Sequence, residues 1–287
     1  MNSVCPRYIN LKGELVDLSC PQVMGILNLT PDSFYAASRT QTSQAIADRT
    51  LEILNQGGSI IDVGAYSSRP GAADVSQEEE MDRLRFGLKS IYQVAPDAVI
   101  SVDTFRADVA RMCVEEYGVG LINDISAGQM DENMFKTMAR LHVPYIIMHM
   151  RGTPQTMQAS LGYENFLKEV FEYFSHKVGL LQELGVNDII LDPGFGFAKT
   201  LTQNYELLAA LDEFAIFDLP ILVGVSRKSM IYKLLGTTPE EALNGTSVLH
   251  TLALERGANI LRVHDVAQAV EVVEIINKIK ESDSLER

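Results

Sequence analysis

The sequence predicts an α/β fold, an eight-stranded parallel (β/α)8 TIM barrel with an N-terminal β-hairpin. Eight short apolar runs recur along the chain, and segments with helical periodicity lie between them. Almost every run ends in Asn, Asp, His, Lys or Arg and is followed by a loop rich in Gly or Pro. Such runs lack an alternating polar side, which is typical of parallel strands covered on both faces. We therefore expect these polar residues to meet at the carboxyl ends of the strands.

The elements can be placed in order along the chain. Residues 8–20, around Lys12 and Gly13, have the pattern of a hairpin, which we expect to cap the bottom of the barrel. The eight expected strands follow it. With the polar residues at their ends, they are 23–27 before Asn28, 60–61 before Asp62, 99–102 before Asp103, 121–122 before Asn123 and Asp124, 144–148 before His149, 189–191 before Asp192, 221–224 before Ser226, Arg227 and Lys228, and 260–261 before Arg262 and His264.

Helical periodicity appears between the strands at 109–117, 163–181 and 266–276. Ser76 and Glu79 fit a capping box before a helix around 81–92, and residues 238–241 (TPEE) predict another helix start. An open doubly wound sheet is the alternative architecture. The barrel is favoured because the units recur evenly and no G-x-G-x-x-G turn follows the first strand.

Composition limits the classes of function. No linker interrupts the 287 residues, so we expect a single domain spanning 1–287. The net charge of -14 argues against nucleic-acid binding, and an anionic substrate would need a local cluster of cations. No targeting segment or membrane span is evident, which predicts a cytoplasmic protein. Cys5, Cys20 and Cys113 follow no disulfide or zinc pattern, and Cys113 is expected in the core.

Several polar residues have ordinary structural explanations. A single Asp or Asn at a strand end is often only a cap for the next helix. Eight strands with polar residues at the same end of the barrel, however, favour a functional site there. Glu80, with its two preceding glutamates, is expected on a solvated helix face, and Lys199 in solvent. The remaining histidines without a motif, expected on the surface or with satisfied hydrogen bonds, are His142, His176 and His250.

The ordered motifs resemble the dihydropteroate synthase family over roughly residues 23–266. The resemblance implies a barrel that is usually a homodimer. It also implies condensation of 6-hydroxymethyl-7,8-dihydropterin pyrophosphate with 4-aminobenzoate, giving dihydropteroate and pyrophosphate in folate biosynthesis, with sulfonamides as inhibitors. The motifs are NLTPDSF at 28–34, DVGAYSSRPG at 62–71, SVDT at 101–104, NDI at 123–125, MHM at 148–150, DPGFGF at 192–197, GVSRKS at 224–229 and RVHD at 262–265.

The resemblance assigns a pterin pocket and three catalytic residues. A pterin edge presents N–H donors, which suit a carboxylate, and acceptors, which suit amide or ammonium donors. The resemblance implies catalytic roles for Asp103, Asp192 and Lys228, through a loose transition state with a cationic pterin. The implied pterin-binding residues are Asp103, Asn123, Met148, Asp192, Phe197 and Lys228, with a weaker expectation for His149.

The same resemblance implies sites for the other two groups. Mg2+ is the implied metal, bound at Asn28, since magnesium prefers oxygen ligands and keeps several waters. The implied pyrophosphate-binding residues are Asn28, Arg69, Arg262 and His264, and the implied aminobenzoate-binding residues are Ser68, Arg69, Pro70, Phe197 and Ser229.

Two residues depart from the family pattern: Ser68 stands where Thr is frequent, and Ala198 where Gly is common. The loss of a methyl at Ser68 could alter the fit of aminobenzoate or sulfonamides. Loops 28–39 and 64–74 are expected to close over the substrates and exclude water. Two other functions compete with the synthase: a pterin-dependent methyltransferase domain and a non-catalytic pterin-binding paralogue. The cations at 69, 262 and 264 and the intact loop motifs favour the synthase.

Overall fold

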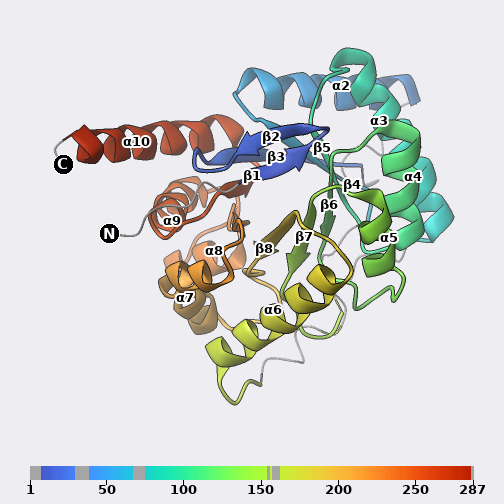
Figure 1. Cartoon of the computed structure of the whole chain (residues 1–287). Coiled ribbons are helices and arrows are strands. Elements are labelled where there is room, and N and C mark those ends of the chain that lie inside the picture. Colours follow the sequence, from blue (N-terminus) through green and yellow to red (C-terminus); the bar gives the residue numbers. More distant parts are fainter. Residues whose placement is uncertain (1–7, 30–38, 67–74, 154–155, 157–161, 286–287) are drawn as a thin grey trace.

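Eight parallel strands form the centre of the molecule in the computed structural model, which describes residues 8–29, 39–66, 75–153, 156 and 162–285 (Figure 1). Helices surround these strands. The strands are β3 (Gln22–Asn28), β4 (Ile60–Gly64), β5 (Ile100–Asp103), β6 (Leu121–Asp124), β7 (Tyr145–Met148), β8 (Ile189–Asp192), β9 (Leu222–Val223) and β10 (Ile260–Val263).

The sheet closes on itself. Hydrogen-bonded neighbours run in the order β8-β7-β6-β5-β4-β3-β10-β9, and every pair is parallel. An isolated parallel bridge between Leu191 and Ile221 joins β8 to the start of β9. This bridge completes the ring, so the predicted barrel is confirmed and the doubly wound alternative is excluded.

The helices follow the strands in alternation. Ser76 Oγ accepts a hydrogen bond from Glu79 N, so the N-cap of α3 is confirmed, but the predicted capping box is only half formed, because the Glu79 carboxylate pairs with Arg83 instead. The helical elements are α2 (Arg39–Asn55), α3 (Gln77–Val94), α4 (Ala107–Tyr117), α5 (Met134–Leu141), α6 (Phe166–Glu183), α7 (Leu201–Ala209), the 3-10 helix η2 (Leu211–Phe217), α8 (Ser229–Leu235), α9 (Leu243–Glu255) and α10 (Val266–Leu285).

The predicted helix start at 238–241 is wrong, because α9 begins at Leu243. These four residues form a turn in which Glu241 N donates to Thr238 O. The guanidinium of Arg227 donates to the carbonyl oxygens of Pro239 and Glu240. A side chain therefore satisfies carbonyls that a helix would use for its own bonds.

The hairpin closes the bottom of the barrel, as predicted. Strands β1 (Tyr8–Leu11) and β2 (Glu14–Asp17) pair antiparallel. Ile9, Leu11 and Leu18 are buried against the inward-facing residues at the strands' amino ends. Those residues are Met24, Ile60, Leu121, Ile146, Ile190, Leu222 and Ile260.

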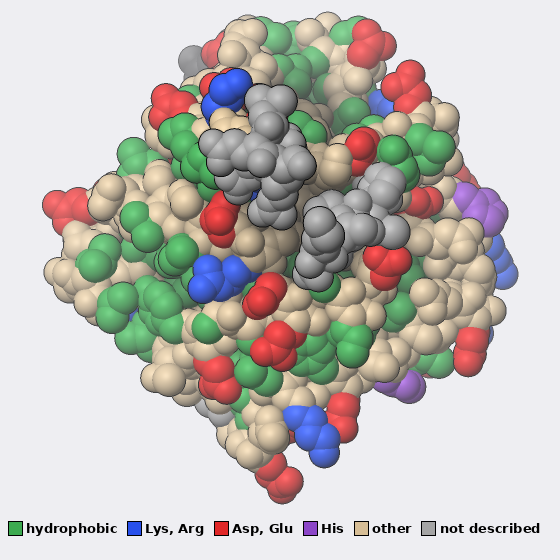
Figure 2. All heavy atoms as spheres, turned by 60° about the vertical axis from the view of Figure 1, so that its left-hand side comes forward, with side chains coloured by type: hydrophobic (Ala, Val, Ile, Leu, Met, Phe, Trp, Pro, Cys, Tyr) green, Lys and Arg blue, Asp and Glu red, His purple; other side chains and the backbone are tan. Residues whose placement is uncertain are grey.

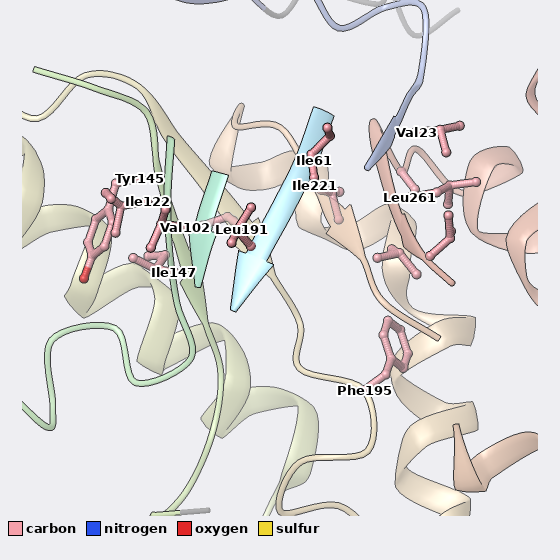
Figure 3. Packing of buried hydrophobic residues seen from close by; sticks show 14 of the residues in the cluster. Val23, Ile61, Val102, Ile122, Tyr145, Ile147, Leu191, Phe195, Ile221 and Leu261 are labelled. Carbon is pink, nitrogen blue, oxygen red and sulfur yellow. The ribbon is translucent and has the colours of Figure 1, made fainter. Parts of the chain in front are cut away.

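The main core lies between the barrel and its helices. Alternate strand residues such as Ile61, Val102, Ile147 and Leu191 belong to one buried cluster, shown in Figure 3. Cys113 on α4 joins this cluster, as expected. Because successive strand residues face opposite ways, the residues between them face the inside of the barrel.

Two further observations concern the described residues as a group. None of their helices is both long and apolar enough to span a bilayer. Cys20 is exposed, Cys113 is buried, and both are free thiols. Cys5 lies outside the described residues.

Candidate functional site

The inward-facing residues change from apolar to polar at the carboxyl end of the barrel. Arg262 on β10 connects two carboxylates there: Nε donates to Asp62 Oδ2 at 2.6 Å, and Nη2 donates to Asp103 Oδ2 at 3.1 Å. Asn123 Nδ2 also donates to Asp62 Oδ2, at 3.2 Å. These residues come from four different strands, so the barrel itself assembles the cluster.

The cluster alters the ionisation of its members. Burial opposes the charge of Arg262, but Asp62 and Asp103 outweigh it and raise the pKa of Arg262 above its ordinary value. Burial, together with the neighbouring carboxylates, raises the pKa of Asp103 to about 7, although Arg262 acts in the opposite direction. Arg262 therefore remains cationic, whereas Asp103 titrates near neutral pH.

A second pair of opposite charges lies beside this cluster. Asp192, at the end of β8, is buried, and its Oδ1 accepts from Gly194 N at 2.8 Å. Lys228 Nζ donates to Phe195 O at 2.6 Å and lies 4.8 Å from the centre of the Phe197 ring. Burial raises the pKa of Asp192 and lowers that of Lys228 to about 8, and the attraction between the two opposes both shifts.

Gly224 lies between the two charged groups. A Cβ on Gly224 would stand 3.8 Å from Arg262 Cβ and 3.8 Å from Lys228 Nζ. Apolar side chains form the other wall: Met148 and Ala198 are buried with Phe105, and Phe197 packs against them. The mouth therefore combines flat apolar surfaces with charged groups of both signs, which suits a planar polar ring.

Asn28 lies at the rim, beside Asp103. A Cβ on Gly64 would stand 3.7 Å from Asn28 Oδ1 and 3.9 Å from Asp103 Oδ2, so both oxygens border the same small space. Among the residues that the structure describes, no group of three His, Cys, Asp or Glu side chains could hold a metal ion. Protein atoms alone therefore form no cage there.

The remaining predicted residues lie on neighbouring loops. His264 is exposed, and its Nδ1 lies 3.1 Å from Ser226 Oγ. Ser229 is partly buried at the start of α8, directly after Lys228. Ser68, Arg69 and Pro70 lie outside the described residues, as do parts of both loops expected to close. The barrel thus brings together Asn28, Asp103, Asn123, Met148, Asp192, Phe197, Lys228 and Arg262.

The expectation that Lys199 is exposed is wrong. Its side chain is 6% exposed, and Nζ donates to the carbonyl oxygens of Gly194, Phe197 and His149 at 2.8, 3.0 and 3.2 Å. Its Nζ also lies 3.0 Å from His149 Nδ1. Every residue has a backbone carbonyl, so the residue types in these two loops do not indicate that carbonyls will surround the lysine. The sequence therefore could not predict its burial.

The expected solvated position of Glu80 is also wrong. Its carboxylate is buried, accepts from Thr104 Oγ1 at 2.7 Å and pairs with Arg106. Burial raises the pKa of Glu80, while Thr104 and Arg106 oppose that shift. Arg106 Nη2 further donates to Val75 O. This network ties the start of α3 to the loop that follows Asp103.

The three histidines without a motif differ from one another. His142 and His176 are exposed, as expected. His250 on α9 is buried, and its Nε2 lacks a hydrogen-bond partner within the described structure, contrary to expectation. Burial lowers the pKa of His250 to about 4, so the ring is neutral at pH 7. A neutral imidazole can pack among apolar side chains at far lower cost than a charged one.

Comparisons with known proteins identify the family. The family model for pterin binding enzymes matches residues 24–264. Dihydropteroate synthase from Escherichia coli (strain K12) is 42% identical over 268 residues, which cover 92% of this chain and 94% of that protein. The enzyme of the same name from Haemophilus influenzae is 38% identical over 270 residues, covering 93% and 96%.

The chain belongs to the dihydropteroate synthase family. Solved structures agree. A Yersinia pestis dihydropteroate synthase in complex with a sulfonamide drug has a TM-score of 0.86 at 40% identity, covering 96% of this chain and 99% of that one. A Xanthomonas albilineans dihydropteroate synthase with 4-aminobenzoic acid has a TM-score of 0.87 at 33% identity, with the same coverages.

Proposed function

We propose that the barrel mouth catalyses the condensation of 6-hydroxymethyl-7,8-dihydropterin pyrophosphate with 4-aminobenzoate to give 7,8-dihydropteroate and pyrophosphate. The proposal depends on one observation: two pairs of opposite charges, Asp192 with Lys228 and Asp103 with Arg262, lie side by side at the carboxyl end of the barrel. The membership of the chain in the dihydropteroate synthase family supports it.

The pterin ring would bind between the Asp192–Lys228 pair and the apolar wall. The Asp192 carboxylate accepts from the pterin's adjacent N–H groups, and Lys228 donates to a ring acceptor. Asn123, oriented by its bond to Asp62, offers its amide to the same edge. Met148 and Phe197 supply the flat apolar contacts.

The chemical step breaks the bond between the pterin CH2 group and the pyrophosphate oxygen, and forms a bond from that carbon to the aminobenzoate nitrogen. Positive charge develops on the pterin as the bond breaks, and ionised Asp103 stabilises it. The attacking nitrogen then loses one proton to water, and the pyrophosphate leaves with the electron pair of the broken C–O bond. Because Asp103 acts on a charge that appears in the transition state, its contribution accelerates the reaction, at about 1.4 kcal/mol for each tenfold in rate.

The leaving pyrophosphate would lie at the cationic side of the mouth. Arg262 is held in place by two carboxylates and presents its charge there, with His264 and Arg69 as further partners. The residues present fit a Mg2+ ion, since Asn28 Oδ1 and a carboxylate oxygen border one space and magnesium accepts few protein ligands. When bound, the ion would neutralise charge on the pyrophosphate.

The aminobenzoate would bind at the outer rim. Phe197 faces the ammonium of Lys228 on one side and can pack against the aminobenzoate ring on another. Ser229, Ser68 and Arg69 would donate hydrogen bonds to its carboxylate, and Pro70 would contact the aminobenzoate without donating. An anionic carboxylate needs such donors in a protein with a net charge of -14, in which acidic side chains are more frequent than basic ones on the face shown in Figure 2.

We also propose that the protein is a homodimer located in the cytoplasm. Large apolar side chains on three neighbouring helices are exposed in the single chain, which favours burial against a second copy. The exposed free thiol of Cys20 suits a reducing compartment. These exposed apolar residues are Leu234 and Leu235 on α8, Val248 and Leu252 on α9, and Ile275 and Ile279 on α10.

Pyrophosphate release tests the proposed reaction. The purified protein is given dihydropterin pyrophosphate and Mg2+, with and without 4-aminobenzoate, and both pyrophosphate and dihydropteroate are measured. We expect release to depend on aminobenzoate and to equal product formation. Tight pterin binding with no turnover would reject the synthase and support a methyltransferase or a pterin-binding paralogue.

A further inference from the structure

Lys199 has a buried amino group that the reaction itself does not use, and burial lowers the pKa of this group to about 7, while the charge of Asp192 acts in the opposite direction. Its ammonium lies below the mouth, between the loop after β7 and the loop after β8. Burying an ammonium is costly unless acceptors replace its water. The three backbone carbonyls around it provide those acceptors, two from the loop after β8 and one from His149. The lysine therefore fastens the two loops to each other.

His149 completes the environment of Lys199. Burial lowers the pKa of His149 well below its ordinary value, and the charges of Lys199 and Arg151 lower it further, so the ring is neutral. Its Nδ1 lies 3.0 Å from Lys199 Nζ, so the three N–H groups of an ammonium are shared among four acceptors, this nitrogen and the three carbonyls. The edge of the His149 ring packs against Tyr173, whose hydroxyl donates to Met148 O. The contacts of Lys199 therefore extend, through His149 and Tyr173, to the end of β7 at Met148.

The loop after β8 fits closely on both sides. A Cβ on Gly194 would stand 2.1 Å from His149 O, and one on Gly196 would stand 3.3 Å from Lys228 Cδ. Both glycines also have positive φ. Asn204 on α7 fixes the middle of the loop, where its Oδ1 accepts from Gly196 N at 2.6 Å. Little room remains for this loop to move without displacing Lys228.

The loop is also the support on which the ligand-facing groups rest. Phe195 O accepts from Lys228 Nζ, Gly194 N donates to Asp192, and Phe197 packs over the mouth. Each of these contacts comes from the segment that Lys199 holds at Gly194 and Phe197. A shift of this segment by one ångström would therefore displace a donor, an acceptor and an aromatic ring together.

We propose that Lys199 is a positioning residue for the pterin: by joining the loop after β8 to His149, it holds Phe197, Asp192 and Lys228 in the arrangement that binds the ring. This inference rests on the proposed function, since it assigns the pterin to that arrangement. It predicts that loss of the ammonium weakens pterin binding more than aminobenzoate binding, because Asp192, Lys228 and Phe197 all contact the pterin in the proposed pose, whereas only Phe197 of these three contacts the aminobenzoate. Small displacements of positioned groups typically cost about 10- to 100-fold.

Two substitutions and a control test the proposal. Lys199→Met keeps the aliphatic stem and removes every donor, and Lys199→Gln keeps two neutral N–H donors. Lys233→Met removes an exposed lysine on α8 and serves as the matched control. The measurements are calorimetric affinity for dihydropterin pyrophosphate, KM for each substrate, and hydrogen exchange along the chain.

We expect Lys199→Met to lose about tenfold or more in pterin affinity, Lys199→Gln to lose less, and Lys233→Met to match the parent. The KM for aminobenzoate should change by less than about threefold. Faster exchange should be confined to peptides around 145–150 and 192–200. If Lys199→Met does not fold, Lys199→Gln is judged by the same criteria.

Three results would overturn the inference: unchanged pterin affinity in both variants, equal changes in both KM values, or faster exchange over the whole chain. The last would mean that Lys199 only stabilises the fold. Failure of the proposed function would look different, because the parent protein itself would not form dihydropteroate. The exchange pattern can be read in either case.

Discussion

The two ends of the barrel are built from the same strands but have opposite chemistry. At the amino ends the interior is apolar and closed by Ile9, Leu11 and Leu18 of the hairpin. At the carboxyl ends it holds carboxylates, amides and cations, several of them buried. The amino end gains stability by excluding water from apolar surface. The carboxyl end holds polar groups whose burial opposes folding unless hydrogen-bond partners replace the lost water, and those partners come from the protein, as at Lys199, or from a ligand.

On a single strand, the inward-facing side chain changes from apolar to polar within two residues. Ile190 and Asp192 face the same interior, one below the other, because side chains on a strand repeat every second residue. Ile60 and Asp62 on β4 repeat this relation. Two such residues on one strand lie about 6 to 7 Å apart. Stability and function can therefore be tested separately by substituting one or the other.

The largest effect is expected at the carboxyl end, from Asp192→Ala. The pterin's N–H donors would lose their acceptor, at a cost of about 3 kcal/mol or more for two donors, which is over 100-fold in affinity. Stability should stay the same or rise, because burial raises the pKa of Asp192 and its charge therefore opposes folding. Calorimetry with dihydropterin pyrophosphate and urea unfolding measure the two quantities.

Asp192→Asn is the matched control, since it keeps the shape and one acceptor oxygen but removes the charge. We expect it to fall between the parent and Asp192→Ala in pterin affinity. An alanine variant that binds the pterin as tightly as the parent would remove Asp192 from the pocket. A large loss of stability in both variants would show that the two ends are not separable.

The opposite result is expected at the amino end, from Ile190→Ala. The side chain is fully buried beneath the hairpin, so its truncation should cost about 2 to 5 kcal/mol of unfolding free energy. Both KM values should remain close to those of the parent at a temperature where the variant is folded. Urea unfolding and steady-state kinetics provide the test. A raised KM with unchanged stability would contradict the division between the ends.

Much of this division was predictable from the sequence. Apolar runs that end in a polar residue indicated the strands and the convergence of Asp103, Asn123, Asp192 and Arg262, since a buried strand has few other reasons to end so. The hairpin and the cap at Ser76 depend on neighbouring residues, so local patterns were enough to predict them.

What the sequence did not predict depends on residues far apart in the chain. Glu80 pairs with Arg106, and Lys199 bonds to the carbonyl of His149 on another loop as well as to two carbonyls of its own loop, so their burial depends on the closed barrel. The turn at 238–241 depends likewise on Arg227. His250 could have been predicted, because it shares a helical face with Thr246 and Ala253, which are both buried.

A smaller effect, on pH dependence, is expected from Asp103. Its folded-state pKa of about 7 lies above the ordinary value near 4, so between these pH values the folded protein holds the extra proton. Its contribution to stability therefore falls as pH rises from about 4 to 7. The activity should rise over the upper part of that window, as the carboxylate that faces the pterin cation becomes ionised.

Asp103→Asn separates these two effects. Urea unfolding at pH 5 and pH 8 should show a smaller loss of stability in the variant than in the parent, and the acid limb of kcat/KM near pH 7 should disappear along with most of the activity. If stability depends on pH in the same way in the parent and in Asp103→Asn, then a group other than Asp103 causes that dependence.

The smallest effect is expected at Ala198, where the family often has glycine. Ala198 has a φ of +46°, and a left-handed conformation costs alanine about 1 kcal/mol relative to glycine. Its methyl, however, is buried beside Met148 and Phe105, and burial of one such group contributes about 0.8 kcal/mol. The two terms nearly cancel, so Ala198→Gly should change the unfolding free energy by less than about 1 kcal/mol. A larger gain in unfolding free energy would mean that the Ala198 methyl packs poorly in the free protein. Titration of the parent and the variant with dihydropterin pyrophosphate would then show whether the methyl contributes to pterin binding.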